Sequence, residues 1–255
     1  MSNLPIWNSK TVVDSYRTQY ELLGPESAII QLFKDQWRNW RMLDIGIGSG
    51  RTTKHFAPLV KEYIGFDYAE AMVKAAQEAF PNIGEHVTIK VGDARSMPEF
   101  ETDYFDFVLF SFNGLDDISY EDRIQALKEM KRVGKKGGYV FFSSHNLEYI
   151  PNLYKIRHNN NLNYFAYQCY RYLMLLYHNG LPQKFRKMEY AVIKDGAEHF
   201  SIKNYYVKPA AMVAQLIELG FKNIRVFPSK SPQEIDLADL GQTGQFGWLH
   251  YLCEL

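Results

Sequence analysis

The chain has 255 residues, of which 46% are hydrophobic and 23% are charged. This composition is that of a globular protein and excludes a disordered, collagen-like or coiled-coil chain. Lys plus Arg and Asp plus Glu both number 29, so the formal net charge is zero. A neutral chain lacks the basic surplus of proteins that bind phosphate backbones, which argues against nucleic acid as a partner.

The two cysteines, Cys169 and Cys253, are far apart and indicate neither a disulfide framework nor a zinc site. We expect free thiols in a reducing compartment. The first residues lack the basic start and apolar run of a secretory signal, and no segment is long and apolar enough to span a bilayer. The sequence therefore predicts a cytoplasmic protein without a metal and without a membrane partner, and it leaves the oligomeric state open.

Helix and strand patterns alternate along the first part of the chain. In chain order we expect helices over 11–23 and 26–39, broken at Gly24-Pro25, a strand over 41–46, a helix over 50–60, a strand over 62–67, a helix over 69–80, strands over 86–92 and 104–112, a helix over 119–133 and a strand over 139–142. Because these strands lack strict polar alternation, the pattern predicts a doubly wound parallel sheet covered on both faces.

This rhythm breaks after His145 and resumes with a helix over 208–219 and strands over 221–227 and 247–255. In between lie a helix-like stretch over 164–178 and two strand-like runs around Asp195-Gly196, a pair typical of tight hairpin turns. We interpret 146–206 as an insertion into a single domain, 1–255, which hangs over one rim of the sheet.

The most informative segment is LDIGIGSGRTT, residues 43–53. A strand ends near Asp44, and Gly46, Gly48 and Gly50 lead into a helix. Glycines at such a turn allow a sharp bend and let a ligand approach bare backbone. The G-x-G-x-G spacing is one residue shorter than the dinucleotide fingerprint G-x-G-x-x-G, and a packing turn without a ligand stays open at this point.

Acidic residues follow the neighbouring strands. Asp67 ends the second strand about twenty residues beyond the glycines, where a carboxylate accepts hydrogen bonds from two ribose hydroxyls. The third strand ends in Gly92-Asp93-Ala94. With Asp44, three consecutive strands place an acid at the carboxyl edge, where open α/β sheets bind ligands.

In these segments the sequence resembles the class I S-adenosylmethionine-dependent methyltransferases of small-molecule type. Asp44 to Gly50 match the family's acidic-x-Gly-x-Gly-x-Gly motif, and the second- and third-strand acids are met in IGFDYAEAMV and VGDARSMP. FDFVLFSFNGLDD and KKGGYVFFSSHN fit the fourth and fifth strand blocks, and LGFKNIRVF and WLHYLCEL fit the antiparallel end hairpin. The resemblance covers 40–145 and 207–255. It implies a Rossmann-like seven-stranded sheet with an antiparallel last strand, and an inserted cap, 146–206, after the fifth strand.

The resemblance also implies S-adenosylmethionine as the cofactor and assigns its contacts. The first-strand motif would face the methionine part, the second-strand end the ribose, the third-strand end the adenine, and the fourth-strand end would form the pocket floor. An N-terminal helix with a tyrosine, as in DSYRTQY, folds over the cofactor in many members, so 1–39 are expected to form lid helices. The implied contacts are Tyr16, Asp44, Gly46, Gly48, Gly50, Asp67, Tyr68, Met72, Asp93, Ala94, Ser111, Phe112 and Asn113.

The sequence constrains the residues that would contact the methyl acceptor less than those that would contact the cofactor. His145, at the end of the fifth strand, is the preferred general base, with a histidine bonded to a loop carbonyl as the alternative. Asp116 and Asp117 either bind a cationic acceptor or cap the next helix, where Ser119 competes as N-cap. The fourth strand lacks the Asp/Asn-Pro-Pro-Tyr/Phe signature of enzymes that methylate amino groups of nucleic acids or glutamine, which again weakens a nucleic-acid role.

We therefore expect a methyltransferase that acts on an O or N atom of a small molecule enclosed by the insertion. An NAD-dependent oxidoreductase is an alternative, against which the glycine spacing and the Gly92-Asp93-Ala94 strand end argue. A protein that binds S-adenosylmethionine without methyl transfer, and an enzyme that methylates proteins, also stay open. The sequence does not name the acceptor.

Overall fold

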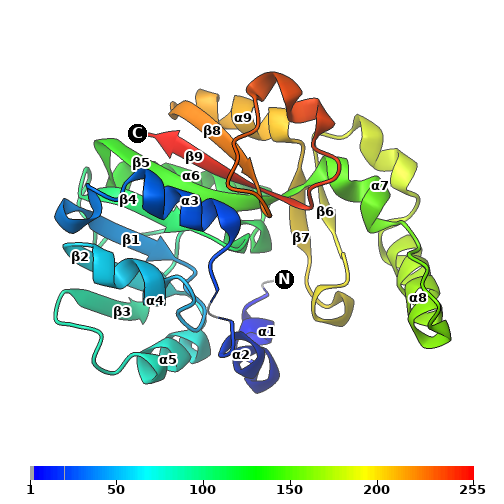
Figure 1. The fold of residues 1–255 in the computed structure, drawn as a ribbon, viewed down its shortest axis with the longest axis horizontal. Coiled ribbons are helices and arrows are strands. Elements are labelled where there is room, and N and C mark those ends of the chain that lie inside the picture. The colour runs from blue at the N-terminus through cyan, green and yellow to red at the C-terminus, as the bar shows by residue number, and fades with distance from the viewer. Residues whose placement is uncertain (1–2, 20) are drawn as a thin grey trace.

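The computed structural model describes residues 3–19 and 21–255, so Met1, Ser2 and Tyr20 lie outside the described residues. Within these ranges the chain forms one mixed sheet flanked by helices on both faces (Figure 1). The parallel strands run in the order β3-β2-β1-β4-β5. Their bounds are β1 Arg41–Ile45, β2 Glu62–Asp67, β3 Val87–Val91, β4 Phe105–Phe110 and β5 Gly134–Asn146.

The sheet continues past β5 with two antiparallel strands. The last strand, β9 (Trp248–Glu254), pairs antiparallel with β5 and with β8 (Lys222–Pro228). These seven strands confirm the expected Rossmann-like sheet with an antiparallel last strand. β5 is much longer than the expected strand over 139–142, because its extra residues at both ends also find partners on neighbouring strands.

The alternation of strand side chains separates two cores. Leu43, Val108 and Val140 belong to one cluster, which α6 (Tyr120–Val133) and α9 (Pro209–Glu218) cover. Their neighbours along the chain, such as Met42, Phe107 and Phe141, belong to the other. The second face is covered by α3 (Gly24–Leu32), η1 (Trp37–Asn39), α4 (Thr53–Phe56) and η2 (Ala57–Leu59). Because successive strand residues point to opposite faces, this division is what a doubly wound sheet requires.

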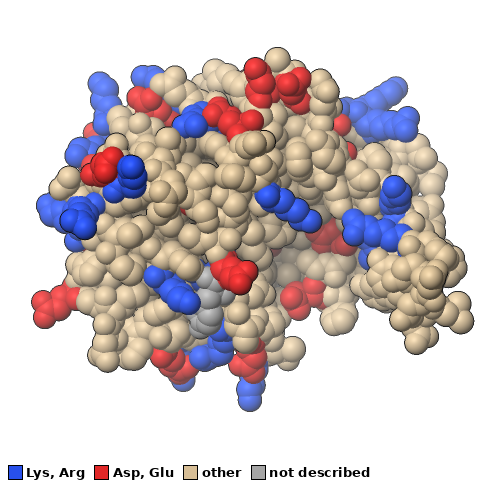
Figure 2. All heavy atoms as spheres, viewed as in Figure 1, with Lys and Arg blue, Asp and Glu red and all other residues tan. Residues whose placement is uncertain are grey.

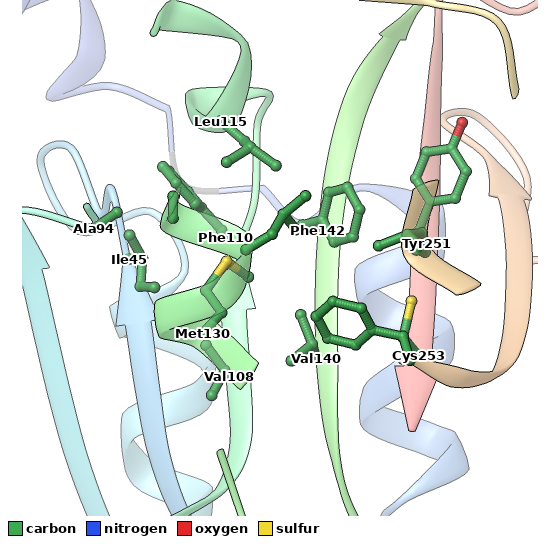
Figure 3. Packing of buried hydrophobic residues seen from close by; sticks show 14 of the residues in the cluster. Ile45, Ala94, Val108, Phe110, Leu115, Met130, Val140, Phe142, Tyr251 and Cys253 are labelled. Atoms are coloured by element: carbon green, nitrogen blue, oxygen red, sulfur yellow. The ribbon is translucent and has the colours of Figure 1, made fainter. Parts of the chain in front are cut away.

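Figure 3 shows part of the first core from close by. Side chains of β4, β5 and β9 point to the same side of the sheet, and Met130 of α6 packs against them. Cys253 is among these residues and is a buried free thiol, as expected, whereas Cys169 is only partly buried. Packing in this core fixes the positions of the strand ends and so holds the carboxyl edge of the sheet in place.

The N-terminal segment packs at the carboxyl edge of the sheet. The helices α1 (Leu4–Trp7) and α2 (Lys10–Tyr16) contact α5 (Glu70–Ala79) through a small apolar cluster that includes Val13 and Met72. The expected helix over 11–23 already ends at Tyr16, whose carbonyl accepts a hydrogen bond from Ser49 Oγ of the glycine turn at 2.7 Å. The expected helix over 50–60 is divided into α4 and η2, because Pro58 has no backbone N–H to continue the helix.

The inserted segment differs from the expectation in its relation to the sheet. Its strands β6 (Tyr190–Ile193) and β7 (Asn204–Val207) form a hairpin, and β7 joins the sheet beside His145 and Asn146 of β5. The other edge of His145 is taken by Trp248 of β9, so β7 lies beyond the carboxyl end of β4. Part of the insertion is therefore an extension of the sheet and not a separate cap above it.

The prediction of a tight turn at Asp195-Gly196 is wrong. The hairpin is connected by the segment 194–203, which contains η6 (Ala197–Phe200). Asp195 uses its carboxylate to accept hydrogen bonds from Ala197 N, Asn204 Nδ2 and Tyr206 OH, which stabilise this longer loop.

The remaining elements are η3 Gly114–Asp117, η4 Leu147–Tyr149, α7 Ile150–Leu153, α8 Leu162–Asn179, η5 Pro182–Lys187 and η7 Leu237–Gln242. No helix in the described part of the chain is long and apolar enough to cross a bilayer.

Candidate functional site

The carboxyl ends of β1, β2 and β4, together with the turn after β3, line a cleft with about 830 Å³ of empty space, part of which is open to solvent. The N-terminal helices contribute Trp7 and Tyr16 to its wall. The expected cofactor contacts that line this cleft are Tyr16, Gly46, Gly48, Asp67, Tyr68, Met72, Asp93, Ala94, Ser111 and Phe112. Segments more than a hundred residues apart in sequence thus meet at one place.

The glycine turn forms one side of the cleft. Gly46 and Gly48 have φ angles of +65° and +55°, the left-handed region that favours glycine. A Cβ atom on Gly46 would lie 2.7 Å from the ring of Phe110, and one on Gly48 would approach the ring of Tyr16 to 3.5 Å. A side chain at either position would therefore strain the turn, and one at position 46 would also collide with Phe110 of β4.

Asp67 holds the glycine turn and the end of β2 together. Its two carboxylate oxygens accept hydrogen bonds from Gly48 N and Ala69 N, both at 2.9 Å. Burial raises the pKa of Asp67, while these backbone donors partly offset the effect. Each carboxylate oxygen has two lone pairs, so the side chain retains capacity to accept from a ligand hydroxyl.

Asp93 is more exposed than Asp67 and is paired with Arg95. The guanidinium of Arg95 donates to both its oxygens, with the shortest contact at 2.6 Å, and this interaction lowers the pKa of Asp93. Arg95 also reaches Asp122 at the start of α6. The carboxylate therefore stays ionised at the third-strand end, where it can accept a further hydrogen bond from the cleft.

The end of β4 forms the cleft floor with an unusual backbone. Phe112 and Asn113 have φ angles of +56° and +60°, which is uncommon for non-glycine residues and rare for a bulky one. Beneath them, Arg51 pairs with the buried carboxylate of Glu26 at 2.6 Å, and Ser111 Oγ bonds both side chains. Strained backbone of this kind tends to occur at functional sites, where the surrounding packing holds it.

Three expected cofactor residues do not line the cleft. Asp44 is buried below the turn and accepts a hydrogen bond from Tyr63 OH at 2.6 Å, and burial raises its pKa to about 7. Gly50 packs against the ring of Phe80, which a Cβ would approach to 2.5 Å. The Asn113 side chain is buried, with its Nδ2 3.4 Å from His145 Nε2. In this structure the three residues support the cleft walls, and their direct contact with the cofactor stays a prediction.

His145 lies behind the floor, paired with Asp116. Its backbone N and its Nδ1 contact Asp116 Oδ2 at 2.6 and 2.8 Å, so the alternative of a loop-carbonyl partner is wrong. Its Nε2 faces Asn113 Nδ2 at 3.4 Å and Asp195 Oδ2 at 3.9 Å. A carboxylate on Nδ1 fixes the ring and favours Nε2 as the proton acceptor, the arrangement of a general base.

The hairpin β6–β7 packs against the His145–Asp116 pair. The Tyr206 ring stacks on His145 at a centroid distance of 4.6 Å, and its hydroxyl donates to Asp195. The connecting loop holds Glu198, His199 and Phe200 with positive φ angles. The insertion thus contributes side chains to the same end of β5 as His145.

Sequence reasoning left Asp117 open and missed the role of Asp116. Asp117 lines the cleft, and burial, with Asp116 close by, raises its pKa well above the usual range of a carboxyl. Asp116 bridges His145 to Arg123 and Ser144 in the interior. Ser119 is the N-cap of α6, accepting from Asp122 N, so the capping role that the sequence offered to the two aspartates belongs to Ser119. Trp7 and Arg95 also line the cleft, and no sequence signal marked either of them.

Comparison with known proteins agrees with this geometry. Residues 43–142 match a family described as "Methyltransferase domain". The chain is 35% identical over 106 residues to an uncharacterised methyltransferase of Bacillus subtilis (strain 168), and this match spans 41% of the chain and 40% of that relative. It is 29% identical over 192 residues to a demethylmenaquinone methyltransferase of Anoxybacillus flavithermus, and that match covers 74% of the chain and 72% of that relative.

Among solved structures, an S-adenosylmethionine-dependent methyltransferase from Clostridium acetobutylicum superposes with a TM-score of 0.60 at 14% identity, over 98% of this chain and 96% of that one. At this identity the likeness concerns the fold alone. Together with the family match over 43–142 and the cleft at the carboxyl edge, this likeness supports a class I S-adenosylmethionine-dependent methyltransferase. The match to a methyltransferase domain favours this class over the NAD-dependent alternative.

The cleft fits the cofactor of this class. The hydroxyl of Tyr68 is buried in the cleft wall and has no hydrogen-bond partner among the described residues. It can therefore bond a ligand in the cleft. Asp67 and Asp93 offer carboxylate oxygens, and Gly46 and Gly48 expose backbone in the same cleft. The donor set therefore combines anionic acceptors for hydroxyl and amino groups with an apolar wall for a base.

Proposed function

We propose that this protein transfers a methyl group from S-adenosylmethionine to an O or N atom of a small molecule. The proposed chemistry on the methyl acceptor is supported by the His145–Asp116 pair. This pair lies at the carboxyl end of β5, directly behind the cleft floor. The family match supports the cofactor side.

The cofactor contacts follow from the positions of the cleft residues. In this proposal Asp67 accepts from the ribose hydroxyls, Tyr68 and Met72 lie against the adenine, and Asp93 accepts from its amino group. Gly46 and Gly48 let the amino-acid end approach the backbone. When bound, S-adenosylmethionine supplies an electrophilic methyl group on a positively charged sulfur.

The chain's own residues then have to orient and deprotonate the acceptor. Much of the acceleration in such a displacement comes from holding the two reactants in line. In this proposal, Asp116 holds the imidazole of His145 so that Nε2 accepts the acceptor proton. The Asn113 amide nitrogen lies 3.4 Å from Nε2, and its side-chain oxygen has no partner among the described residues.

The inserted segment is proposed to enclose the acceptor. Its hairpin contributes Tyr206 and Asp195 beside His145, and its strained loop, η6, continues over the same end of the sheet. Tyr16 of α2 bounds the cleft from the other side, which supports a lid role for α1 and α2. The expected lid over all of 1–39 is too long, because α3 and η1 pack in the core on the second face of the sheet. The acceptor would then be bound between the inserted segment and the N-terminal helices.

A second candidate is transfer to a carbon atom. The relatives named demethylmenaquinone methyltransferases favour an acceptor of the quinone type, and such a reaction forms a carbon–carbon bond. A general base would serve here too, because an ionised ring hydroxyl makes the neighbouring carbon nucleophilic.

The deciding experiment uses S-adenosylmethionine labelled with ¹³C in the methyl group, together with metabolite extract and purified protein. We expect formation of S-adenosylhomocysteine and a metabolite that gains one labelled CH₂ unit in its mass spectrum. The ¹³C chemical shift of the product then distinguishes methyl groups on O, N and C. Binding of S-adenosylhomocysteine without turnover in any extract would support a non-catalytic role instead.

A further inference from the structure

The helix α8 (Leu162–Asn179) presents apolar side chains on the side that faces away from the protein. Leu162, Ala166, Tyr170, Leu173 and Tyr177 follow one another at intervals of four, four, three and four residues, so they form one stripe along the helix. Leu162, Leu173 and Tyr177 are 79%, 62% and 81% exposed. We call these five residues the α8 stripe.

The opposite side of α8 packs on the protein. Leu175 is buried there in an apolar cluster that Tyr172, Met174 and Leu176 also contact, and Gln168 and Asn179 are buried at 6% and 7% exposure. The stripe is therefore a second apolar side of the helix, and the protein leaves it exposed. Figure 1 shows that α8 projects from the body of the molecule, and Figure 2 shows uncharged atoms over its free end. A contiguous exposed apolar surface of this kind indicates an interaction site.

The charges around the stripe specify the partner. From Tyr149 to Met188 the sequence contains six basic residues and no Asp or Glu, although the whole chain has 29 of each sign. Figure 2 shows basic side chains where α8 approaches the body. The six are Lys155, Arg157, Arg171, Lys184, Arg186 and Lys187. A surface that combines an apolar stripe with unbalanced positive charge is complementary to an anionic interface.

A small polar cavity at the base of α8 also indicates an anionic partner. It is lined by Arg157, Arg171, Asn152 and Gln168, among others. Neither arginine pairs with a carboxylate among the described residues, and their guanidinium groups donate to Tyr149 OH and to the carbonyl of Lys155. The side-chain oxygen of Gln168 is buried there without a partner in the described part of the chain. Two guanidinium groups without a counter-ion, beside an unsatisfied polar atom, suit a phosphate-bearing headgroup.

We propose that the α7–α8 face binds the surface of a membrane that contains anionic lipids, with the α8 stripe in the headgroup–acyl boundary and the basic residues on the headgroups. A second copy of the chain is a poorer partner, because pairing two such faces brings like charges together. Leu and Tyr are side chains suited to the interfacial zone, and surface binding requires no spanning segment. The sequence-based expectation of no membrane partner considered only spanning segments.

The test is co-sedimentation of the whole protein with vesicles of phosphatidylcholine alone or with about a third phosphatidylglycerol. Wild type is expected to bind the anionic vesicles and to be released by high salt, because the attraction to the headgroups is screened. Leu173→Glu is expected to reduce the partition coefficient at least tenfold, because it places a charge in the apolar boundary. The matched control Ile217→Glu, on exposed α9 surface at 61% exposure, is expected to bind as wild type.

A second pair of variants tests the charge. Arg157→Gln/Arg171→Gln is expected to weaken binding to anionic vesicles severalfold, whereas Lys34→Gln/Arg38→Gln, which removes the same charge from another exposed surface, leaves it unchanged. All variants should keep the wild-type melting temperature, since the changed side chains are not in the core.

Three results would overturn the proposal. They are equal binding of wild type and Leu173→Glu, equal binding to neutral and anionic vesicles, and a dimer that Leu173→Glu dissociates while vesicles bind neither form. Retention of a protein from an extract without vesicle binding would also count against it. The proposal is independent of the methyl-transfer reaction, so its failure and that of the reaction are separately visible.

Discussion

At the scale of single residues, His145 and Asp116 form the arrangement on which the proposed acceptor chemistry depends. Asp116 uses one oxygen for His145 and the other for Arg123 and Ser144, so it holds the ring through a network anchored in the core. Neither residue was expected to be paired in this way. The sequence placed His145 at a strand end and Asp116 after another, and only the sheet brings the two strand ends together.

His145→Gln is expected to lower kcat by about 10²–10⁴ because the proton acceptor is lost, with little change in affinity for S-adenosylhomocysteine. Asp116→Asn should also lower kcat, because it loosens the histidine, while leaving that affinity intact, since Asp116 does not line the cleft. Steady-state kinetics and calorimetry measure the two quantities separately. The control His86→Gln, at an exposed histidine bonded to Ala57 O, should behave as wild type. Full activity in His145→Gln would exclude its role as the base.

Asp44 illustrates how burial changes the role of a motif residue. Because burial raises its pKa to about 7, against an ordinary value of 3.8, the folded state prefers the neutral carboxyl. The stability from this preference is fully present below about pH 4 and is lost as the pH rises through about 7. Asp44→Asn is neutral at every pH and does not lose it.

The melting temperature of Asp44→Asn relative to wild type is therefore expected to rise between about pH 4 and pH 8, by about 2–4 °C for each kcal/mol involved. Thermal denaturation across this range measures the trend. Asp35→Asn, at an exposed position, should show no such trend. A difference that is constant with pH would mean that Asp44 is ionised in the folded protein.

At the scale of elements, α2 and the glycine turn act as a unit. Ser49 Oγ donates to the carbonyl of Tyr16 at the end of α2, and the Tyr16 ring lies against Trp7 and Phe112. The helix therefore covers the glycine turn through one hydrogen bond and a set of ring contacts. Because these rings line the cleft, the position of α2 bears directly on ligand binding.

Ser49→Ala removes that hydrogen bond and is expected to weaken binding of S-adenosylhomocysteine by about two- to tenfold, the equivalent of about 0.5–1.5 kcal/mol. Isothermal calorimetry measures this change. Thr18→Ala is the matched control, since its hydroxyl donates to Ser15 O within the same segment. Equal loss in both variants would show that general destabilisation of the segment, and not its contact with the turn, controls binding.

At the scale of the whole molecule, the cleft joins the N-terminal helices to the sheet, so a ligand that binds there should stabilise the fold as a unit. A ligand that binds only the folded state at about 100 times its Kd adds about 2.7 kcal/mol. We expect S-adenosylhomocysteine to raise the melting temperature of wild type by several degrees. NAD is expected to have no such effect.

The same measurement tests Asp67. Asp67→Ala is expected to weaken S-adenosylhomocysteine binding tenfold or more, because each hydrogen bond to a charged group contributes about 1.5–3 kcal/mol, and to reduce the ligand-induced shift accordingly. Asp35→Ala, which removes an exposed carboxylate elsewhere, should keep the full shift. An undiminished shift in Asp67→Ala would contradict the assignment of the ribose contact.

Local patterns in the sequence determined the strands, the order of the elements and the class of the fold. Gly46, Gly48, Asp67 and Asp93 were identifiable because a strand-to-helix turn and a parallel sheet constrain which residues follow each strand. Apolar runs such as that of β4 predict buried strands directly, since hydrophobic periodicity is a local property of the chain.

Only the tertiary structure decided which of those residues face the cleft and which lie beneath it. Asp44 belongs to the same motif as Gly46, yet a pleated strand turns its carboxyl inward to Tyr63. The partners of His145 come from η3 and from the inserted hairpin, and the sequence pattern contains no signal for contacts between segments so far apart. The outward apolar stripe of α8 was likewise undecided, because periodicity shows that a helix has an apolar side but not whether the protein covers it.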